Sequence, residues 1–205
     1  MRDRIRLIWK QIPRYPFVSI TIVGINLLVF ILCMIFPQIY DKGGSGIYQV
    51  LFCKDYGRVL WTMFLHSDAE HIFNNMIIVL FLGSMLERQV GHIKYGLVYF
   101  ISGIGASLFS LWVKWYQYDW SVSIGASGAV FGLDGLLLAM VLFRKDDMDL
   151  PIARVVLVIF LSVYSGFSNN GIDNAAHVGG LLLGFVLGAV ICICMNAKRK
   201  GVYRR

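Results

Sequence analysis

Two residues of this chain, a serine and a histidine, have the types needed for nucleophilic catalysis, and both lie in strongly apolar surroundings. Ser127 opens one apolar stretch and His177 opens another. A serine hydroxyl becomes a useful nucleophile when a nearby histidine removes its proton. Polar residues in membrane segments usually face a bundle interior or a water-filled cavity. The pair therefore predicts a serine nucleophile and its histidine base, held between two membrane segments.

A single serine or histidine does not by itself require catalysis. An isolated serine in a membrane helix is more often a packing residue, because its hydroxyl can bond its own backbone. A buried membrane histidine is less easily explained that way, since its polar ring needs a partner. The argument for chemistry therefore depends on the two residues meeting.

The elements that must bring them together are membrane helices. Of the 205 residues, 58% are hydrophobic, and the mean hydropathy of +0.68 is too high for an ordinary soluble domain of this length. A membrane helix needs about 20 predominantly apolar residues. Charged residues delimit six such stretches, between Arg14 and Asp41, Glu70 and Glu87, Lys94 and Lys114, Asp119 and Arg144, Arg154 and Asp173, and Asp173 and Lys198.

These stretches predict an all-α, six-helix membrane bundle. The connections between them are short, so we expect one membrane domain over residues 1–205, with short basic arms at about 1–14 and 198–205. The second stretch is the shortest, and we expect it to extend into the residues around His66. Asp134 is the one charged residue that interrupts the fourth.

The distribution of basic residues predicts the orientation in the membrane. With six spans, 15 of the 19 lysines and arginines lie on the side of the two termini, and the opposite side has only Lys42, Lys54, Arg58 and Lys114. The positive-inside rule then places both termini in the cytoplasm. The basic residues border the spans and form no stripe of the kind that binds nucleic acid, so anionic lipid headgroups are the expected partner.

This orientation places four polar side chains at one level. The second, fourth and sixth spans all run inward from the outer surface. His71 and Asn75 lie four residues apart on one face of the second span, and Ser127 and His177 lie near the outer starts of the other two. Their agreement predicts a polar cavity that opens outward.

Small residues give the helices a means of close approach. Small-xxx-small ridges allow helix backbones to come together in lipid, although most such ridges serve packing alone. A serine–histidine hydrogen bond between two helices requires such an approach. The ridges here are Gly128, Gly132 and Gly135 in the fourth span and Gly180, Gly184 and Gly188 in the sixth.

Three motifs stand out in these segments, namely His66-x4-His71-x3-Asn75, Gly125-x-Ser127-Gly128 and Ala176-His177-x2-Gly180-x3-Gly184. They resemble those of the rhomboid intramembrane serine proteases, and the resemblance covers nearly the whole chain. Each is weak alone, but their order and their placement in the membrane make the combination specific.

The resemblance implies a role for each matching residue. Ser127 would be the nucleophile and His177 the general base, without the acidic third member of a soluble triad. His71, Asn75 and the backbone N–H of Ser127 would stabilise the oxyanion. The implied activity is endopeptidase cleavage of membrane proteins near the outer end of a transmembrane segment, with no metal and no organic cofactor.

Supporting positions match the family in part. Gly57 stands before Arg58 where many members have tryptophan, so the anchoring of the first outer loop is expected to differ. Phe131 stands where members place an aromatic ring against the catalytic histidine. His66 matches a position thought to support loop structure.

Two acidic residues near the motifs are expected to have no catalytic role. Asp134 lies two helical turns beyond Ser127, about 11 Å away, which is beyond hydrogen-bond reach. We expect it to be protonated, solvated or paired. Asp173 precedes His177 by four residues and could orient it, but a loop or helix-cap role is favoured.

Three other functions are weaker interpretations of this sequence. Glu70-His71 lacks the H-E-x-x-H pattern of a zinc protease. A membrane chaperone of the rhomboid-like superfamily would lack the serine or the histidine, and both are present. A transporter would show inverted repeats or interrupted helices, which are not apparent. The compact form resembles bacterial members, which favours a bacterial plasma membrane; the natural substrate and the oligomeric state are not specified.

Overall fold

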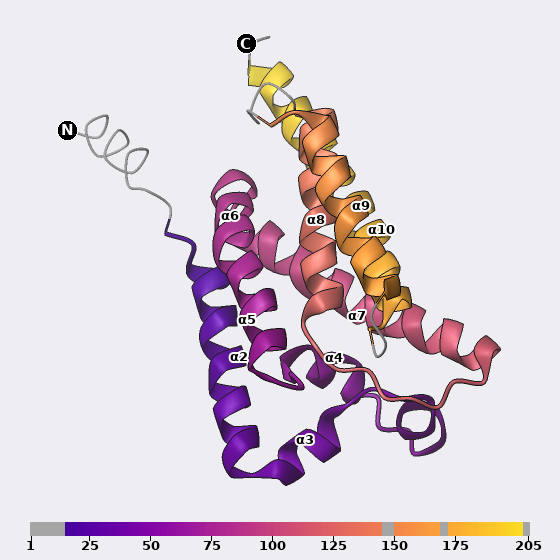
Figure 1. The fold of residues 1–205 in the computed structure, drawn as a ribbon. Coiled ribbons are helices and arrows are strands. Elements are labelled where there is room, and N and C mark those ends of the chain that lie inside the picture. The colour runs from indigo at the N-terminus through magenta and orange to yellow at the C-terminus, as the bar shows by residue number, and fades with distance from the viewer. Residues whose placement is uncertain (1–14, 145–149, 169–171, 203–205) are drawn as a thin grey trace.

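The structure, a computed structural model, describes residues 15–144, 150–168 and 172–202, and this part of the chain is helical apart from loops and one isolated β-bridge between Ser45 and Ser123 (Figure 1). The predicted N-terminal arm, residues 1–14, lies outside the described residues. The elements are α2 (Phe17–Ile35), α3 (Pro37–Gly43), the π-helix η1 (Tyr48–Phe52), α4 (Arg58–Trp61), the 3-10 helix η2 (Thr62–Phe64), α5 (Ala69–Ile78), the π-helix η3 (Val79–Gly83), α6 (Ser84–Val90), α7 (His92–Gln117), α8 (Ser127–Phe143), α9 (Ile152–Ser168) and α10 (Asn174–Val202).

Each of the six predicted stretches contains a helix. Within the described residues, four helical segments are long and apolar enough to cross a bilayer, namely Phe17–Ile35, Ala69–Val90, His92–Gln117 and Asn174–Ala197. The helix α8 and the apolar part of α9, Ile152–Ser162, are shorter. The protein is thus a helical membrane protein, and the six-span count and the side of the termini stay predictions. The predicted C-terminal arm begins inside α10, which continues to Val202.

The second span differs from its predicted position. It was expected to end at Glu87 and to extend toward His66, but it runs from Ala69 through α5, η3 and α6 to Val90. Glu87 is buried within this longer helical segment, and its carboxylate accepts hydrogen bonds of 2.8 Å from the backbone N–H groups of Val18 and Ser19. These are unpaired N–H groups in the first turn of α2, where a negative charge is favoured.

Glycines bring α8 and α10 into backbone contact, and Figure 1 shows the two helices running alongside each other. A Cβ atom added at Gly180 would collide with the carbonyl oxygen of Gly128, and one added at Gly184 would collide with that of Gly132. Only glycine permits this separation. The contact brings the first turns of α8 and α10 together, where Ser127 and His177 lie.

The segment between α2 and α5 is partly helical, which the sequence did not predict. Its elements α3, η1, α4 and η2 precede the second span. Ile47, Val50 and Val59 pack with Leu111 of α7 in a small apolar cluster of their own. An apolar groove of about 660 Å³ lies between η1, α4 and α7, and neither Ser127 nor His177 lines it.

Candidate active site

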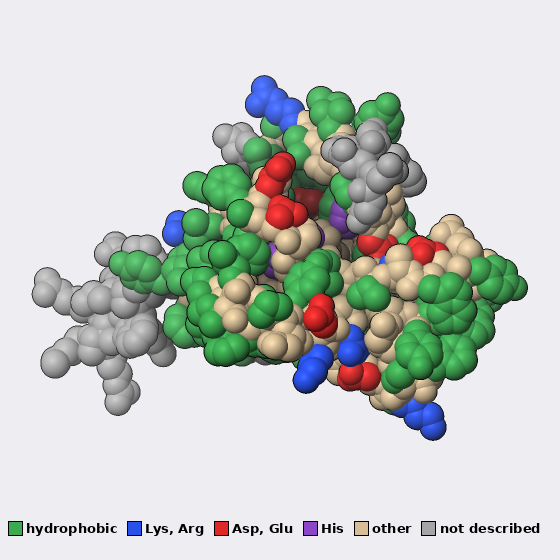
Figure 2. Space-filling view, turned by 60° about the horizontal axis from the view of Figure 1, so that its bottom comes forward, with side chains coloured by type: hydrophobic (Ala, Val, Ile, Leu, Met, Phe, Trp, Pro, Cys, Tyr) green, Lys and Arg blue, Asp and Glu red, His purple; other side chains and the backbone are tan. Residues whose placement is uncertain are grey.

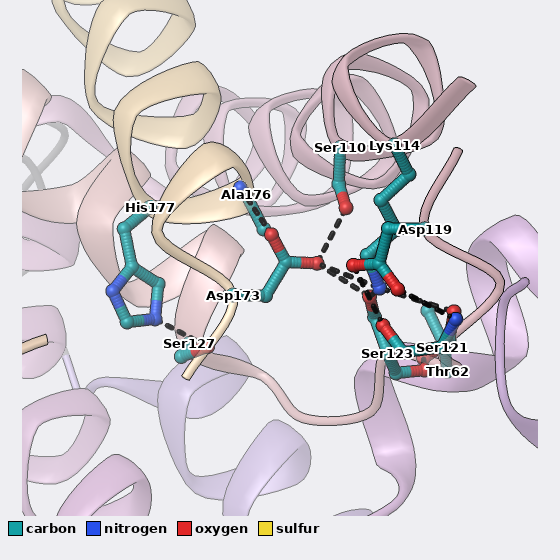
Figure 3. A network of polar contacts seen from close by, with 10 residues as sticks. All are labelled: Thr62, Ser110, Lys114, Asp119, Ser121, Ser123, Ser127, Asp173, Ala176 and His177. Carbon is teal, nitrogen blue, oxygen red and sulfur yellow. Dashed lines mark hydrogen bonds and ion pairs between the residues drawn. The ribbon is translucent and has the colours of Figure 1, made fainter. Parts of the chain in front are cut away.

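Ser127 and His177 meet across the interface of α8 and α10. The Oγ atom of Ser127 lies 3.0 Å from Nε2 of His177, within hydrogen-bond distance (Figure 3). Ser127 is the first residue of α8, and His177 is in the first turn of α10. The His177 ring is largely buried, with 8% of the residue exposed. The helices therefore bring a candidate nucleophile and base to contact distance.

The His177 ring is supported by stacking. Phe131, one turn after Ser127, lies with its ring centroid 4.2 Å from that of His177 and with an interplanar angle of 18°. Within the described residues, Nδ1 of His177 has no hydrogen-bond partner. An acidic third residue is thus not seen against this ring in the described part of the chain, and stacking against Phe131 supports its orientation.

His71 lies beside the turn that leads into Ser127. Gly125 adopts a φ of +120°, and a Cβ atom at that position would lie 2.8 Å from Nε2 of His71. The imidazole therefore packs directly over this glycine, which explains why no larger residue fits. Its Nδ1 atom lies 3.1 Å from Oγ of Ser67, which leaves Nε2 on the side of the Gly125 turn.

Asn75 lies one turn beyond His71 on the same helix, as predicted from their spacing. Its residue is 5% exposed, and its Nδ2 donates a hydrogen bond of 3.0 Å to the backbone oxygen of His71. The start of this helix is fixed by Asp68, whose carboxylate accepts from the His71 backbone N–H at 2.8 Å. Hydrogen bonds from Ser67 and from His71 hold the pKa of Asp68 below its ordinary value.

His66 lies in the loop before α5, with its ring edge-on to that of His71 at a centroid distance of 5.0 Å. It is buried, at 3% exposure. Burial, followed by the charge of His71, lowers the pKa of His66 to about 4. The ring is therefore neutral at physiological pH and packs beside His71.

Arg58 ties the first loop together by its own contacts. Its Nε atom lies 2.8 Å from the carboxylate of Asp55, and a terminal nitrogen donates to the backbone oxygen of Gly44 at 3.0 Å. Gly57, which stands where the family often has tryptophan, lies in open surroundings, since a Cβ there would meet only Asp55 at 3.8 Å. The loop is thus anchored at Arg58 in this chain.

The two acidic residues singled out from the sequence lie in different settings. Asp173 caps α10, because its carboxylate accepts from the Ala176 backbone N–H at 2.9 Å, as the cap interpretation predicted. Its side chain points away from the His177 ring, toward the end of α7 (Figure 3). Asp134 lies half-buried on α8, seven residues beyond Ser127.

The structure also shows polar residues near the site that sequence reasoning missed. Ser110 and Lys114 of α7 and Ser123 of the following loop converge on Asp173. Lys114 was counted only as the outer boundary of the third stretch. The only available signal was the opposite charge of Lys114 and Asp173 on one predicted side, and the sequence does not show that these residues meet.

The end of the molecule at which α5 and α10 begin is hollowed. Figure 2 turns this end toward the viewer and shows histidine side chains within the hollow, next to acidic side chains. Among the described residues, no group of three or more histidine, cysteine, aspartate or glutamate side chains has a geometry that could hold a metal ion. At Ser127 a hydroxyl lies next to an imidazole, which is the arrangement that nucleophilic catalysis by serine requires.

Known proteins similar to this chain carry related names. RHOMBOID-like protein 4 of Arabidopsis thaliana is 37% identical over 154 residues, which cover 74% of this chain and 38% of that protein. Rhomboid protease AarA of Providencia stuartii is 29% identical over 198 residues, 82% of this chain and 70% of that protein. Rhomboid-type serine protease 2 of Emericella nidulans is 32% identical over 148 residues, 71% of this chain and 29% of that protein.

The chain thus spans less than half the length of the plant and fungal relatives. A family model, the Rhomboid domain, matches residues 54–194. That region contains Arg58, the histidine–asparagine motif of α5, and both Ser127 and His177. With the fold and these matches together, the chain belongs to the rhomboid family.

Proposed function

We propose that this protein is an intramembrane serine endopeptidase that uses Ser127 as nucleophile and His177 as general base. The observation that carries the proposal is the 3.0 Å separation of Ser127 Oγ and His177 Nε2 across two helices. Two relatives with protease in their names support it. The substrates are membrane proteins, and the location is a bacterial plasma membrane, with residues 1–205 acting as one membrane domain.

The reaction begins with transfer of the Ser127 proton to His177. In the neutral imidazole with its proton on Nδ1, Nε2 is free to accept the hydroxyl proton. The Ser127 oxygen attacks the peptide carbonyl, and the imidazolium then gives its proton to the leaving amine. The resulting ester on Ser127 is hydrolysed by water that His177 deprotonates in the same way.

The negative charge that develops on the carbonyl oxygen needs fixed donors. The N–H of Ser127 lies in the first turn of α8, where backbone N–H groups have no acceptor within the helix, and the ring of His71 lies over the adjacent Gly125 turn. Asn75 is the third donor, once its amide turns from the His71 backbone oxygen toward the substrate. Loss of one such donor typically lowers kcat by about 10²–10³.

The substrate segment must be locally unwound. An intact helix keeps its carbonyl groups in internal hydrogen bonds, so a serine cannot reach them productively. We therefore expect cleavage near the outer end of a transmembrane segment that has helix-destabilising and small residues. We expect water to reach Ser127 through the hollow that Figure 2 shows at this end of the molecule.

The test compares purified wild type with Ser127→Ala and His177→Ala for cleavage of a panel of transmembrane reporters in liposomes. Both variants should lose cleavage while they retain their thermal unfolding profile, and a metal chelator should have no effect on wild type. A folded wild type that binds transmembrane helices but cleaves none would instead favour a membrane chaperone.

A further inference from the structure

A partly buried polar cluster lies beside the dyad and is separate from it. We call Asp173, Lys114, Ser110 and Ser123 the Asp173 cluster. Ser110 and Ser123 both donate their hydroxyl protons to one carboxylate oxygen of Asp173, and Lys114 Nζ lies 3.7 Å from the same oxygen. Lys114 also donates to Ser123 Oγ at 2.6 Å and to the Ser121 backbone oxygen at 3.2 Å. The cluster thus joins α7, the loop after it and the start of α10.

The backbone of Ser123 extends this connection to the first loop. Ser123 exchanges two backbone hydrogen bonds with Ser45, of 2.9 and 2.8 Å. Its carbonyl also accepts from the Thr62 hydroxyl at 2.6 Å. Two residues later, the Gly125 N–H donates to the Thr62 backbone oxygen at 3.0 Å. The loop that leads into Ser127 is therefore held by hydrogen bonds at both Ser123 and Gly125.

Both members of the dyad lie close to this cluster along the chain. Ser127 follows Ser123 by four residues, and His177 follows Asp173 by four. The backbone N–H of His177 donates to the Asp173 backbone oxygen at 3.2 Å, so the first turn of α10 links the two directly. In Figure 3 the Asp173 side chain reaches the cluster on one side while the His177 ring faces Ser127 on the other.

We propose that the Asp173 cluster is a positioning device that holds the Ser127 loop and the start of α10 at the separation the dyad needs. The proposal rests on the proposed function and adds residues that do not touch the reacting atoms. A misplacement of about 1 Å can lower an enzymatic rate by about 10²-fold. The Ser123 hydroxyl accepts from Lys114 and donates to Asp173, so it joins the Ser127 loop directly to the start of α10.

The opposite charges of Lys114 and Asp173 stabilise the cluster. Lys114 is 7% exposed, and a buried ammonium without its partner is strongly unfavourable. Burial alone would raise the pKa of Asp173, but hydrogen bonds from Ser110, Ser123 and Ala176 and the charge of Lys114 hold it below its ordinary value. The carboxylate is therefore ionised at physiological pH, and the cluster is fully formed.

The first experiment measures kcat and KM for Asp173→Asn, Lys114→Met and the double variant. Asparagine caps a helix as well as aspartate, so Asp173→Asn removes the charge while it retains the cap. Each single variant should lower kcat by about tenfold or more with KM changed by less than about threefold. The fold-decrease in kcat of the double variant should be smaller than the product of the two single-variant decreases, because the double variant leaves no buried charge unpaired.

Two further variants separate positioning from folding. Lys114→Arg, which keeps the charge, should recover more of the kcat than Lys114→Met. Asp119→Asn is the matched control, since Asp119 accepts from Ser121 in the same loop and is not part of the cluster. If Asp173→Asn lowers the melting temperature but leaves kcat per folded molecule at the wild-type value, the cluster serves the fold alone and the proposal is wrong.

A second readout needs no cleavage. A nearby imidazole promotes ionisation of a thiol, so Ser127→Cys should be alkylated faster than Ser127→Cys combined with His177→Ala. The rate is followed by mass spectrometry of that peptide, because the four native cysteines are free as well. In the Ser127→Cys background, adding Asp173→Asn should slow alkylation toward the rate of the variant that also has His177→Ala. Adding Asp119→Asn to the same background should leave the alkylation rate unchanged.

The two readouts distinguish the two proposals. A wild type that cleaves no reporter overturns the protease, but the alkylation rates still report whether the cluster sets the approach of residues 127 and 177. An alkylation rate unchanged by Asp173→Asn overturns the positioning role, even if the wild type is an active protease.

Discussion

At the scale of single residues, the His177 ring is oriented mainly by contacts that carry no charge. Nε2 lies 3.0 Å from Ser127 Oγ, and the face of the ring stacks on Phe131. The nearest acidic side chain in sequence, Asp173, is engaged with the helix N-terminus and with α7. In soluble serine proteases an aspartate orients the imidazole. Here an aromatic ring supplies that support.

Replacement of Phe131 by alanine should therefore lower cleavage. Aromatic stacking is worth about 0.5–1.5 kcal/mol, which corresponds to about 2–12-fold in kcat per folded molecule. Phe131→Tyr should retain most activity. Phe143→Ala is the control, because Phe143 pairs with Phe185 between the same two helices. Equal activity of Phe131→Ala and wild type would contradict the supporting role.

His66 should make the protein less stable in mild acid. Its pKa is about 4 in the folded protein and 6.5 in its ordinary state. Between these values the unfolded chain binds a proton that the folded chain does not. Protonation of His66 therefore leaves the free energy of unfolding unchanged above pH 6.5 and lowers it progressively as the pH falls toward 4. The slope approaches about 1.4 kcal/mol per pH unit.

The measurement is the free energy of unfolding in mixed micelles at several pH values, for wild type and His66→Gln. The pH dependence over this range should be shallower in the variant, whatever its absolute stability. Parallel curves would show that His66 does not titrate differently in the two states.

At the scale of elements, the glycine contact of α8 and α10 sets the spacing of the site. Backbone atoms meet at Gly180 with Gly128 and at Gly184 with Gly132. Helices with side chains at these points would lie farther apart. Because Ser127 and His177 begin the same two helices, their hydrogen bond depends on this spacing.

Gly184→Ala should therefore destabilise the protein and reduce cleavage. The added methyl group would meet the Gly132 carbonyl, and overpacking of this kind typically costs about 1–3 kcal/mol. Gly24→Ala on α2 is the matched control, since nothing lies within 4 Å of its added Cβ. Thermal unfolding and reporter cleavage should both be lowered in the first variant and retained in the second. A Gly184→Ala protein as stable and active as wild type would contradict the contact.

At the scale of the whole molecule, the site lies toward one end of the bundle. The helices α5, α8 and α10 each place a site residue within or next to their first two turns. The basic residues of the sequence concentrate on the side predicted to be cytoplasmic. If the predicted orientation holds, the site lies toward the outer surface, where cleavage would release the exterior part of a substrate.

A native cysteine tests this orientation. Cys53 is exposed in the loop before α4, whereas Cys33, Cys192 and Cys194 lie within α2 and α10. A membrane-impermeant maleimide should label Cys53 in intact cells, and Cys53→Ser should lose that label. A tag on the C-terminus should become accessible only after permeabilisation. Labelling of Cys53 only in permeabilised cells would reverse the predicted topology.

Local sequence was sufficient to predict the helical stretches, the glycine ridges and the family. Apolar stretches of membrane length form helices because hydrocarbon leaves their backbone groups no other partner. The motifs around Ser127, His177, His71 and Asn75 are short, so they are visible without knowledge of the fold. The meeting of Ser127 and His177 was predicted from their shared depth, and the structure brings them to 3.0 Å.

Tertiary structure alone decided where the charged residues have their partners. Glu87 was expected to end a span, yet it is buried against the first turn of α2, 68 residues away in the chain from Ser19. Lys114 and Asp173 were expected to mark loop boundaries, yet they form one cluster with Ser123. The sequence shows the position of a charged residue, but the partners that stabilise its charge when it is buried come from segments far away in the chain. That is why the sequence alone predicted the dyad and missed the cluster beside it.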